Sequence, residues 1–290
     1  MRAKMEQELS GLFTMAAMVE ARDPYTVGHA WRVSRYARLL AEGSVQSEET
    51  VALVSAAGFL HDVGKIGISD AVLLRPEHLI ESEYELVKEH SGVGVRLLDG
   101  HPLADFLREA ILHHHERPDG KGYPAGLKGL EIPLAARIIG LADAFDAMTS
   151  ARPWRRAMPL DQVLNAIEAG LGQEFDAEFG ARFVSLARAG ALNHIIGHSD
   201  LGVPVQECPN CGPVVNVFRT HRPGDKVYCR LCANEFVVGR ADGKLALEIT
   251  GFKGRPSVAV PQPDAELISR LVLDCVAHLP LKPAQDGGRV

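Results

Sequence analysis

Apolar residues recur at intervals of three and four positions through the first two thirds of the chain, up to about residue 190. This spacing is typical of amphipathic helices, and no strand-like alternation interrupts it. Helices are predicted near the N-terminus and over residues 27–43, 48–65, 82–100, 103–116, 134–150, 160–170 and 176–190. Thr26 and Ser82 are placed to cap the second and fourth of these helices. The pattern predicts a mainly α domain over residues 1–199.

The pattern changes near residue 200, where short runs rich in Val, Phe, Tyr and Gly replace the helical spacing. The turn sequences "PGD" and "ADG" separate these runs, so a small β domain is predicted over residues 204–256. Helical spacing returns in a last segment, at Leu267, Leu271, Val272, Cys275 and Leu279. Residues 262–290 are therefore predicted to form a C-terminal helix and a tail, with residues 282–290 frayed.

The composition is that of a soluble globular protein, with 46% hydrophobic and 23% charged residues among 290. The net charge of -6 is uneven, because residues 1–200 carry 20 Lys and Arg against 28 Asp and Glu, whereas residues 201–290 carry 11 against 9. The acidic part is unsuited to non-specific nucleic-acid binding. No apolar run approaches about 18 residues and the N-terminus lacks a secretory pattern. We therefore expect a cytoplasmic protein with no membrane segment.

Eight of the twelve histidines lie between residues 29 and 115, several at positions that a helix directs inward. His29 follows a predicted helix start, His61 and Asp62 end an apolar helix, and His90 lies between apolar neighbours. Buried imidazoles need partners for both ring nitrogens, and divalent metals supply them. His113 either joins such a site or only continues its helix. The remaining lone histidines are more typical of surface or capping positions: His78, His101, His194, His198 and His278.

The candidate ligands are imidazoles and carboxylates without cysteine. Such a set suits iron, manganese, nickel or zinc in a catalytic site better than a closed structural zinc site. Six or seven candidates exceed what one open site uses, and a carboxylate such as Asp62 can bridge two ions. Two metals are therefore predicted.

The cysteines form a second candidate metal site. Cys208, Cys211, Cys229 and Cys232 give the spacing C-x2-C-x17-C-x2-C, which predicts one structural zinc in a zinc-ribbon-like segment. A redox role is the alternative, and the absence of a βαβ pattern disfavours it. Cys275 is interpreted as a small apolar residue.

The role of the zinc-ribbon-like segment stays open between docking a partner and bracing the fold. Its eight Lys and Arg against five acids over residues 204–255 are too weak a bias to indicate nucleic acid. If it is a docking or regulatory module, deletion of residues 204–290 should leave the helical domain folded. Loss of folding would indicate bracing.

Two separated stretches resemble a known family. "FLHDVGKIGISD" resembles the signature of the HD superfamily of metal-dependent phosphohydrolases, and "HHERPDGKGYPAGLKGLEIPLAARIIGLADAFDAMTSARPWR" is similar to the HD-GYP subfamily. The resemblance covers about residues 10–190. It implies an HD-type helical bundle with a two- or three-metal centre, a bacterial signalling phosphodiesterase that hydrolyses cyclic di-GMP to pGpG or GMP. Iron or manganese is the favoured metal.

The resemblance also implies roles for individual residues. The implied metal ligands are His29, His61, Asp62, His90, His114, His115 and Asp143. Lys65 would face the substrate phosphate, although a lysine at a helix end is often only solvated. Some family members carry a Glu four residues before the first ligand histidine, where it supports a third metal. This chain has Tyr25 there, so two metals are predicted.

Three further residues are expected to bind the substrate. Tyr123 of "GYP" would line the pocket and could stack on guanine, the alternative being a ring packed on its own domain. Arg152 and Arg155 would contact phosphate, the alternative being hydrogen bonds to the carbonyls that end the preceding helix.

Two other functions remain open. The same site would serve another cyclic dinucleotide, such as cyclic GMP-AMP, or the domain would bind nucleotide without cleaving it. The second option is disfavoured by the presence of His61, Asp62, Lys65 and the GYP sequence. A protein partner for the zinc-ribbon-like segment and a homodimer are options that the sequence leaves open.

Overall fold

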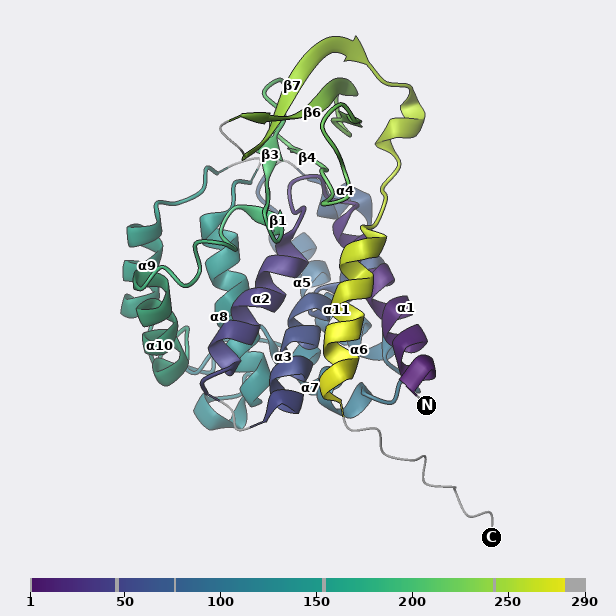
Figure 1. The fold of residues 1–290 in the computed structure, drawn as a ribbon. Helices are drawn as coiled ribbons and strands as arrows, with labels where there is room; N and C mark the ends of the chain where they lie inside the picture. The colour runs from purple at the N-terminus through teal and green to yellow at the C-terminus, as the bar shows by residue number, and fades with distance from the viewer. Residues whose placement is uncertain (1, 45–46, 76, 153–154, 242–243, 280–290) are drawn as a thin grey trace.

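The fold is a helical bundle with a small β unit at one end (Figure 1). The computed structural model describes residues 2–44, 47–75, 77–152, 155–241 and 244–279. The helices in the first part are α1 (Arg2–Glu20), α2 (His29–Ala41), α3 (Glu48–Leu60), α4 (Asp70–Leu73), α5 (Glu81–Lys88), α6 (His90–Leu97), α7 (Ala104–His113), α8 (Leu134–Thr149), α9 (Leu160–Ala169) and α10 (Ala177–Arg188), with short 3-10 helices η1 (Val63–Gly67) and η2 (Gly129–Glu131). The prediction of a mainly α domain is confirmed.

Helix α2 lies at the centre of the bundle, packed against α3 and α8. Its buried face includes Tyr36, whose ring makes edge contacts with Phe145 of α8 and Phe183 of α10. All three rings are fully buried. The apolar stripes predicted from the spacing therefore meet in one core, and the three rings join helices far apart in the sequence.

Several helix boundaries differ from those predicted. The helix expected over residues 48–65 ends at Leu60 and continues as η1, and the one expected over residues 82–100 divides into α5 and α6 at Glu89. Thr26 does not cap α2, because its hydroxyl donates to backbone carbonyls of the preceding turn and Gly28, at φ 79°, precedes the helix. Ser82 lies inside α5 rather than before it. Spacing alone thus placed the helices but not these ends.

The β unit consists of short antiparallel strands. β1 (His198–Asp200) pairs with β2 (Val203–Pro204), and β3 (Gln206–Glu207) pairs with β4 (Val214–Val215). β5 (Lys226–Tyr228), β6 (Asn234–Ala241) and β7 (Lys244–Lys253) form a sheet in that order. A separate small core holds the unit together, and its buried members include Cys208, Cys229 and Phe236. The 3-10 helix η3 (Pro256–Ala259) then leads back to the bundle.

The last helix, α11 (Ala265–His278), packs on α1 and α3 and belongs to the core of the bundle (Figure 1). Its inward residues, among them Ile268, Val272 and Cys275, are buried in that core. Cys275 is thus an apolar core residue, as predicted. A deletion of residues 204–290 removes this helix, which favours loss of folding as its outcome. The tail predicted for residues 282–290 lies outside the described residues.

We expect the two faces of α11 to respond differently to truncation. Ile268→Ala should lower the free energy of unfolding by about 2–5 kcal/mol, because the buried side chain leaves a cavity. Leu273→Ala, on the same helix but 48% exposed, should change it by less than about 0.5 kcal/mol. Urea unfolding of both variants measures the difference. Equal effects would show that α11 does not stabilise the bundle.

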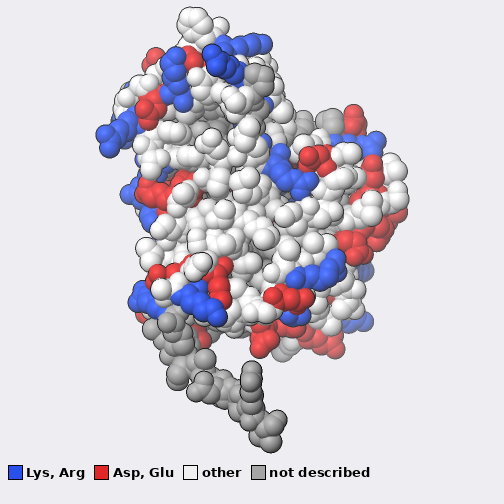
Figure 2. Space-filling view, turned by 90° about the vertical axis from the view of Figure 1, so that its right-hand side faces the viewer, with Lys and Arg blue, Asp and Glu red and all other residues white. Residues whose placement is uncertain are grey.

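The face shown in Figure 2 has no strong segregation of charge over the helices. Lys and Arg side chains gather at the end of the β unit away from the bundle, whereas both signs are mixed over the helical face (Figure 2). Among the described residues, no helix combines the length and apolar character needed to cross a bilayer.

Candidate metal centres and active site

One group of candidate ligands joins three helices. His29 at the start of α2, His61 just after α3 and Asp143 in α8 place their ligand atoms within 4.8 Å of one another. The Nε2 atoms of His29 and His61 are 3.3 Å apart, and Nε2 of His29 lies 3.4 Å from Oδ1 of Asp143. Both imidazoles are buried. Three residues separated by up to 114 positions thus converge on one point.

A second group lies beside the first. His90 begins α6, and His114 and His115 follow α7, again with their ligand atoms within 4.8 Å. The Nε2 atoms of His90 and His114 are 3.3 Å apart. His113, the first of the three consecutive histidines, belongs to none of the metal-binding groups found in the described part of the chain, and neither do the five lone histidines set aside above.

Asp62 lies between the two groups and presents one carboxylate oxygen to each. Its Oδ2 is 3.6 Å from Nε2 of His29 and 3.4 Å from Nε2 of His61, whereas its Oδ1 is 3.5 Å from Nε2 of His90. Burial alone would raise the pKa of Asp62, but Lys65 and the neighbouring imidazoles lower it well below its ordinary value. An ionised carboxylate in this position can bridge two cations.

Four of these imidazoles are oriented by hydrogen bonds from their other ring nitrogen. Nδ1 of His61, His90 and His114 lies 2.6–2.7 Å from the backbone carbonyl three residues earlier, and Nδ1 of His29 lies 2.8 Å from the carboxylate of Asp146. Because a carbonyl only accepts, Nδ1 carries the proton in the first three rings. Their Nε2 lone pairs then face the centre, as metal-ligating histidines require.

The electrostatics of the two groups fit bound cations. Burial lowers the pKa of His90 and, together with neighbouring imidazoles, lowers those of His114 and His115 well below the ordinary value, so these rings present neutral nitrogen donors. Burial also lowers the pKa of His29, but hydrogen bonds to Asp146 and Asp62 outweigh it and raise the value to about 9. Positive charge is therefore favoured at the first group, where the Nε2 atoms of His29 and His61 face each other.

Asp146 and Arg32 support the first group and were not predicted from the sequence. Asp146 is fully buried and lies one helical turn after Asp143 on α8. Besides holding His29, its carboxylate accepts from both Nε and Nη2 of the buried Arg32, at 2.5 and 3.0 Å. The spacing of the two aspartates in "LADAFDAM" is the signal that could have suggested a shared face.

A cavity of about 390 Å³ opens beside the first group. Its walls include His29, Asp62 and Lys65, together with Arg152 and Arg155 from the segment after α8. The helix at His61 does not continue to Lys65, which lies on η1 with its Nζ 2.5 Å from Oδ2 of Asp62. The cavity thus combines three cationic side chains with the candidate metal ligands.

The two arginines differ in their contacts. Arg152 and Arg155 exchange backbone hydrogen bonds of 2.8 and 3.0 Å, and both side chains line the cavity. Arg155 also donates from its guanidinium to the carbonyl of Ala147 in the last turns of α8. The alternative of helix-end hydrogen bonding is therefore realised for Arg155, although its side chain still borders the cavity.

A second cavity, of about 300 Å³, also borders Asp143 and is lined by His114, His115 and Tyr123. The ring of Tyr123 stacks on His115 with 4.7 Å between the ring centroids. The loop that carries it is held by Glu116, whose carboxylate accepts from the backbone of Ala125, Gly126 and Leu127 at 2.6–3.0 Å. Glu116 is a further residue that the sequence did not single out.

Gly64 of "HDVGK" allows η1 to touch the helix that carries His90. A Cβ atom added at Gly64 would lie 1.8 Å from the carbonyl oxygen of His90 and 2.4 Å from the amide nitrogen of Gly94. The backbone of Gly64 is not in the left-handed region, so close packing explains the glycine at this position.

Gly64→Ala is expected to push α6 away from η1 and so displace His90. We predict a loss of about 1–3 kcal/mol in the free energy of unfolding, with weaker Mn²⁺ binding. Gly92→Ala on the same α6 is the matched control, because its nearest contact would be 3.7 Å away, at the end of Arg96. Urea unfolding and Mn²⁺ titration compare the two. Equal behaviour would contradict the packing role.

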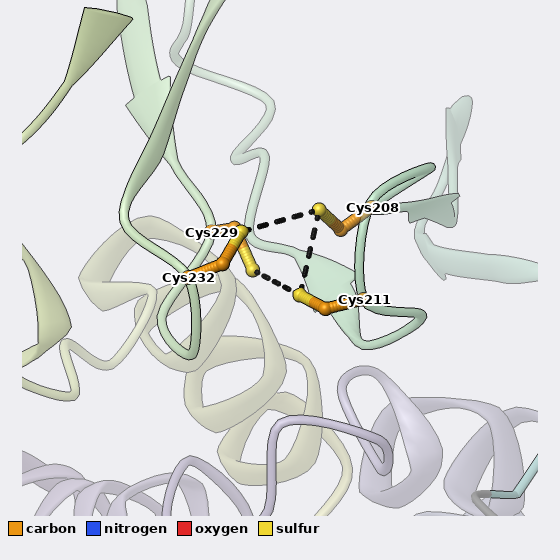
Figure 3. A group of neighbouring side chains, drawn as sticks. All are labelled: Cys208, Cys211, Cys229 and Cys232. Atoms are coloured by element: carbon orange, nitrogen blue, oxygen red, sulfur yellow. Dashed lines mark hydrogen bonds between the residues drawn. The ribbon is translucent and has the colours of Figure 1, made fainter.

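The four cysteines converge in the β unit, as the spacing predicted (Figure 3). Sulfur atoms of Cys208 and Cys232, and of Cys208 and Cys211, are 3.7 Å apart, and those of Cys211 and Cys229 are 3.4 Å apart. Four sulfurs at about 2.3 Å from a zinc ion would be about 3.8 Å from one another. The cluster therefore has close to the size that tetrahedral zinc needs, and none of the four forms a disulfide.

The converging histidines and aspartates on a helical bundle agree with comparisons to known proteins. The model of the family described as "HD domain" matches residues 14–179, more than half of the chain. The chain belongs to the HD domain family. An HD domain implies divalent metal binding, so we refer to the two groups and Asp62 together as the HD centre.

Curated relatives share this HD domain. The chain is 44% identical over 173 residues to "Cyclic di-GMP phosphodiesterase response regulator RpfG" of Xanthomonas campestris, covering 59% of this chain and 46% of that protein. It is 40% identical over 163 residues to "3'3'-cGAMP-specific phosphodiesterase 3" of Vibrio cholerae, covering 56% and 35% respectively. The chain thus spans about half or less of the length of these relatives.

Among solved structures, a crystal structure of a cyclic GMP-AMP specific phosphodiesterase from V. cholerae is similar to the HD domain. It has a TM-score of 0.50 at 18% identity and covers 65% of this chain and 50% of that one. At this identity the likeness concerns the fold alone. It confirms the HD-type helical fold that the sequence predicted.

Proposed function

We propose that this chain is a metal-dependent phosphodiesterase that hydrolyses cyclic di-GMP to pGpG or GMP. The observation that carries the proposal is the carboxylate of Asp62, which presents one oxygen to each of two histidine groups. The similarity of the chain to curated cyclic dinucleotide phosphodiesterases supports the substrate class. The ligand set proposed is His29, His61, Asp62 and Asp143 for one ion, and Asp62, His90, His114 and His115 for the other.

Two divalent ions, with iron or manganese favoured for this donor set, would lower the pKa of a water and neutralise charge on the phosphodiester. The protein supplies the remaining requirements. Neutral imidazoles hold cations without cancelling their charge, and the buried hydrogen bonds behind them fix their direction. These imidazole ligands are thus oriented before a metal ion binds.

Substrate binding is assigned to the cationic side of the first cavity. When the carboxylate of Asp62 binds metal, the ammonium of Lys65 is free to turn to a phosphate oxygen across the same cavity. Arg152, which lines this cavity, would bind phosphate there, and Arg155 hydrogen-bonds the carbonyl of Ala147 at the end of α8. Tyr123 borders the second cavity, where a base would lie against the ring that already stacks on His115.

A second candidate substrate is cyclic GMP-AMP, favoured by the 40% identity to a relative whose name specifies that dinucleotide. It requires the same phosphodiester chemistry and differs only in one base. A nucleotide-binding domain without turnover is the remaining alternative, and the presence of all seven proposed ligands and Lys65 disfavours it.

The deciding experiment is metal analysis of the purified chain together with product identification. Protein loaded with iron or manganese under anaerobic conditions is incubated with cyclic di-GMP and, separately, with cyclic GMP-AMP. We expect two ions at the HD centre and linear product from cyclic di-GMP. No product from either dinucleotide would rule out the enzyme, and product from cyclic GMP-AMP alone would reassign the substrate.

The four-cysteine site is proposed to hold one structural zinc. The small core of the β unit, with eight buried members, is too limited to fold without such a crosslink. A homodimer and a protein partner for the β unit stay predictions.

A further inference from the structure

The four-cysteine module, residues 204–255, has no part in the proposed hydrolysis, yet it contacts the segment that introduces the HD centre. This segment is the turn between α1 and α2, residues 21–28. It contacts the module at two places, each beside a cysteine pair. The amide of Val214 donates to the carbonyl of Pro24 at 2.9 Å, and the guanidinium of Arg230 donates to the carbonyl of Ala21.

Both contacts depend on the cysteine pairs for their position. Arg230 directly follows Cys229, and Val214 follows Pro213, whose carbonyl accepts from the amide of Cys208 at 2.8 Å. A Cβ atom added at Gly212 would lie 3.9 Å from the ring of Tyr25, which directly follows Pro24 in the turn. A metal that draws the four sulfurs together therefore also fixes the two groups that hold the turn.

The residues on either side of Ala21 hold the start of α2, which carries His29, and the segment with Lys65. Glu20 accepts from the amides of Gly28 and Ala30 at 3.2 and 2.7 Å, which flank His29. Arg22 donates to the carbonyls of Lys65 and Ile68 at 2.9 and 2.6 Å. The first ligand histidine and the segment with Lys65 are thus both tied to residues 20–22.

Strand β1 adds a further contact on the same side. The carbonyl of His198 accepts from Arg32, the partner of Asp146, at 3.0 Å. A Cβ atom at Gly28 would lie 2.5 Å from the Cα atom of Ser199, so the strand packs directly on the residue before His29. The start of α2 is therefore enclosed by the chain that leads into the module.

We propose that the four-cysteine module regulates the HD centre, with Arg230 as a positioning residue for His29 and Lys65. Zinc bound at the four sulfurs holds Arg230 and Val214 against the turn, and loss of zinc releases it. His29 and Lys65 then lose part of their orientation, and ordering them again costs binding free energy. This inference rests on the proposed function in one respect only, that the regulated reaction is the proposed hydrolysis.

The expected loss of Mn²⁺ affinity follows from known effects of residues that support metal ligands. Loss of a residue that hydrogen-bonds a metal ligand lowers metal affinity by about 10–100-fold. Arg230 does not contact a ligand directly but acts through the turn at Ala21. We therefore expect the affinity of the HD centre for Mn²⁺ to fall on the order of tenfold in Arg230→Ala. The zinc content of this variant should stay at one ion, because all four cysteines remain.

The test uses the full chain and compares three variants at two arginines of the module, with Cys232→Ser as a fourth variant. Arg230→Ala removes the contact to Ala21, Arg230→Lys keeps a donor, and Arg219→Ala removes an exposed arginine from the same module as a matched control. Mn²⁺ affinity is measured by electron paramagnetic resonance of free Mn²⁺. Amide hydrogen exchange of residues 20–32 is followed in parallel.

Arg230→Ala is expected to bind Mn²⁺ more weakly and to exchange faster over residues 20–32. Arg219→Ala should match the wild type, and Arg230→Lys should recover part of the loss. Wild-type affinity and exchange in Arg230→Ala would overturn the proposal. Cys232→Ser, which removes zinc, should reproduce the loss, and because it can unfold the module, Arg230→Ala decides the outcome if the two disagree.

Neither measurement needs a substrate, so the two proposals fail separately. If no dinucleotide is cleaved but Mn²⁺ affinity depends on Arg230, the coupling stands and the enzyme assignment fails. If cyclic di-GMP is cleaved and Mn²⁺ affinity is independent of Arg230, the enzyme assignment stands and the coupling is wrong.

Discussion

Asp62→Asn is expected to abolish binuclear metal binding and to lower turnover on the order of 10³-fold. The carboxamide keeps the shape of the side chain but has only one oxygen, so it cannot serve both histidine groups. Metal ions contribute several kcal/mol of transition-state stabilisation in such sites, and each 1.4 kcal/mol corresponds to about a tenfold change in rate. Metal content and the rate of cyclic di-GMP hydrolysis are the measurements.

The control is Asp161→Asn, an exposed aspartate in the first turn of α9. It should keep two metal ions and the wild-type rate, which separates the bridging role from a general effect of lost charge. A rate in Asp62→Asn within tenfold of the wild type would show that Asp62 does not bridge the two ions.

The residues that converge at the HD centre were largely predictable because their types are rare in helix interiors. His61 with Asp62, and His114 with His115, stand out in apolar helices, where unpaired imidazoles would be costly. His29 and His90 were singled out by positions that a helix directs inward, and resemblance to a family then supplied Asp143. The structure brings all of these predicted ligands together, and the fold class followed from the same helical spacing.

The supporting residues were not predictable, because their partners lie far away in the sequence. Asp146 pairs with Arg32 across 114 residues, and Arg230 contacts Ala21 across 209. Helical spacing reports which face of a helix is buried, not what that face meets. Acids such as Glu20 and Glu116 read as ordinary surface charges until their backbone partners are known.

The position of α11 was not predictable for the same reason. Its apolar stripe predicted burial, but the sequence offered no reason to choose the bundle over the β unit. The structure places Ile268 and Val272 in the core with α1 and α3. The C-terminal segment consequently serves two parts of the molecule, with its β strands over the turn before His29 and its helix in the bundle.

Asp146→Asn is expected to have the largest effect on stability of any single change near the HD centre. Asp146 and Arg32 are both buried and form a bidentate ion pair. The other hydrogen-bond partners described for the Arg32 guanidinium are backbone carbonyls and a serine hydroxyl, so Asp146 is the one carboxylate among them. Removing one member of a buried ion pair costs about 3–5 kcal/mol, because the other charge stays desolvated. The carboxamide also holds His29 less firmly, which should weaken metal binding by about 10–100-fold.

Asp143→Asn separates these two effects, because Asp143 lies one turn away on α8 and faces His29 without contacting Arg32. Urea unfolding in the presence of a chelator should show a loss of about 3–5 kcal/mol for Asp146→Asn and little change for Asp143→Asn. Mn²⁺ titration should show weaker binding for both. Wild-type stability of metal-free Asp146→Asn would mean that Arg32 finds another counter-charge, and that the buried pair is not what anchors His29 to α8.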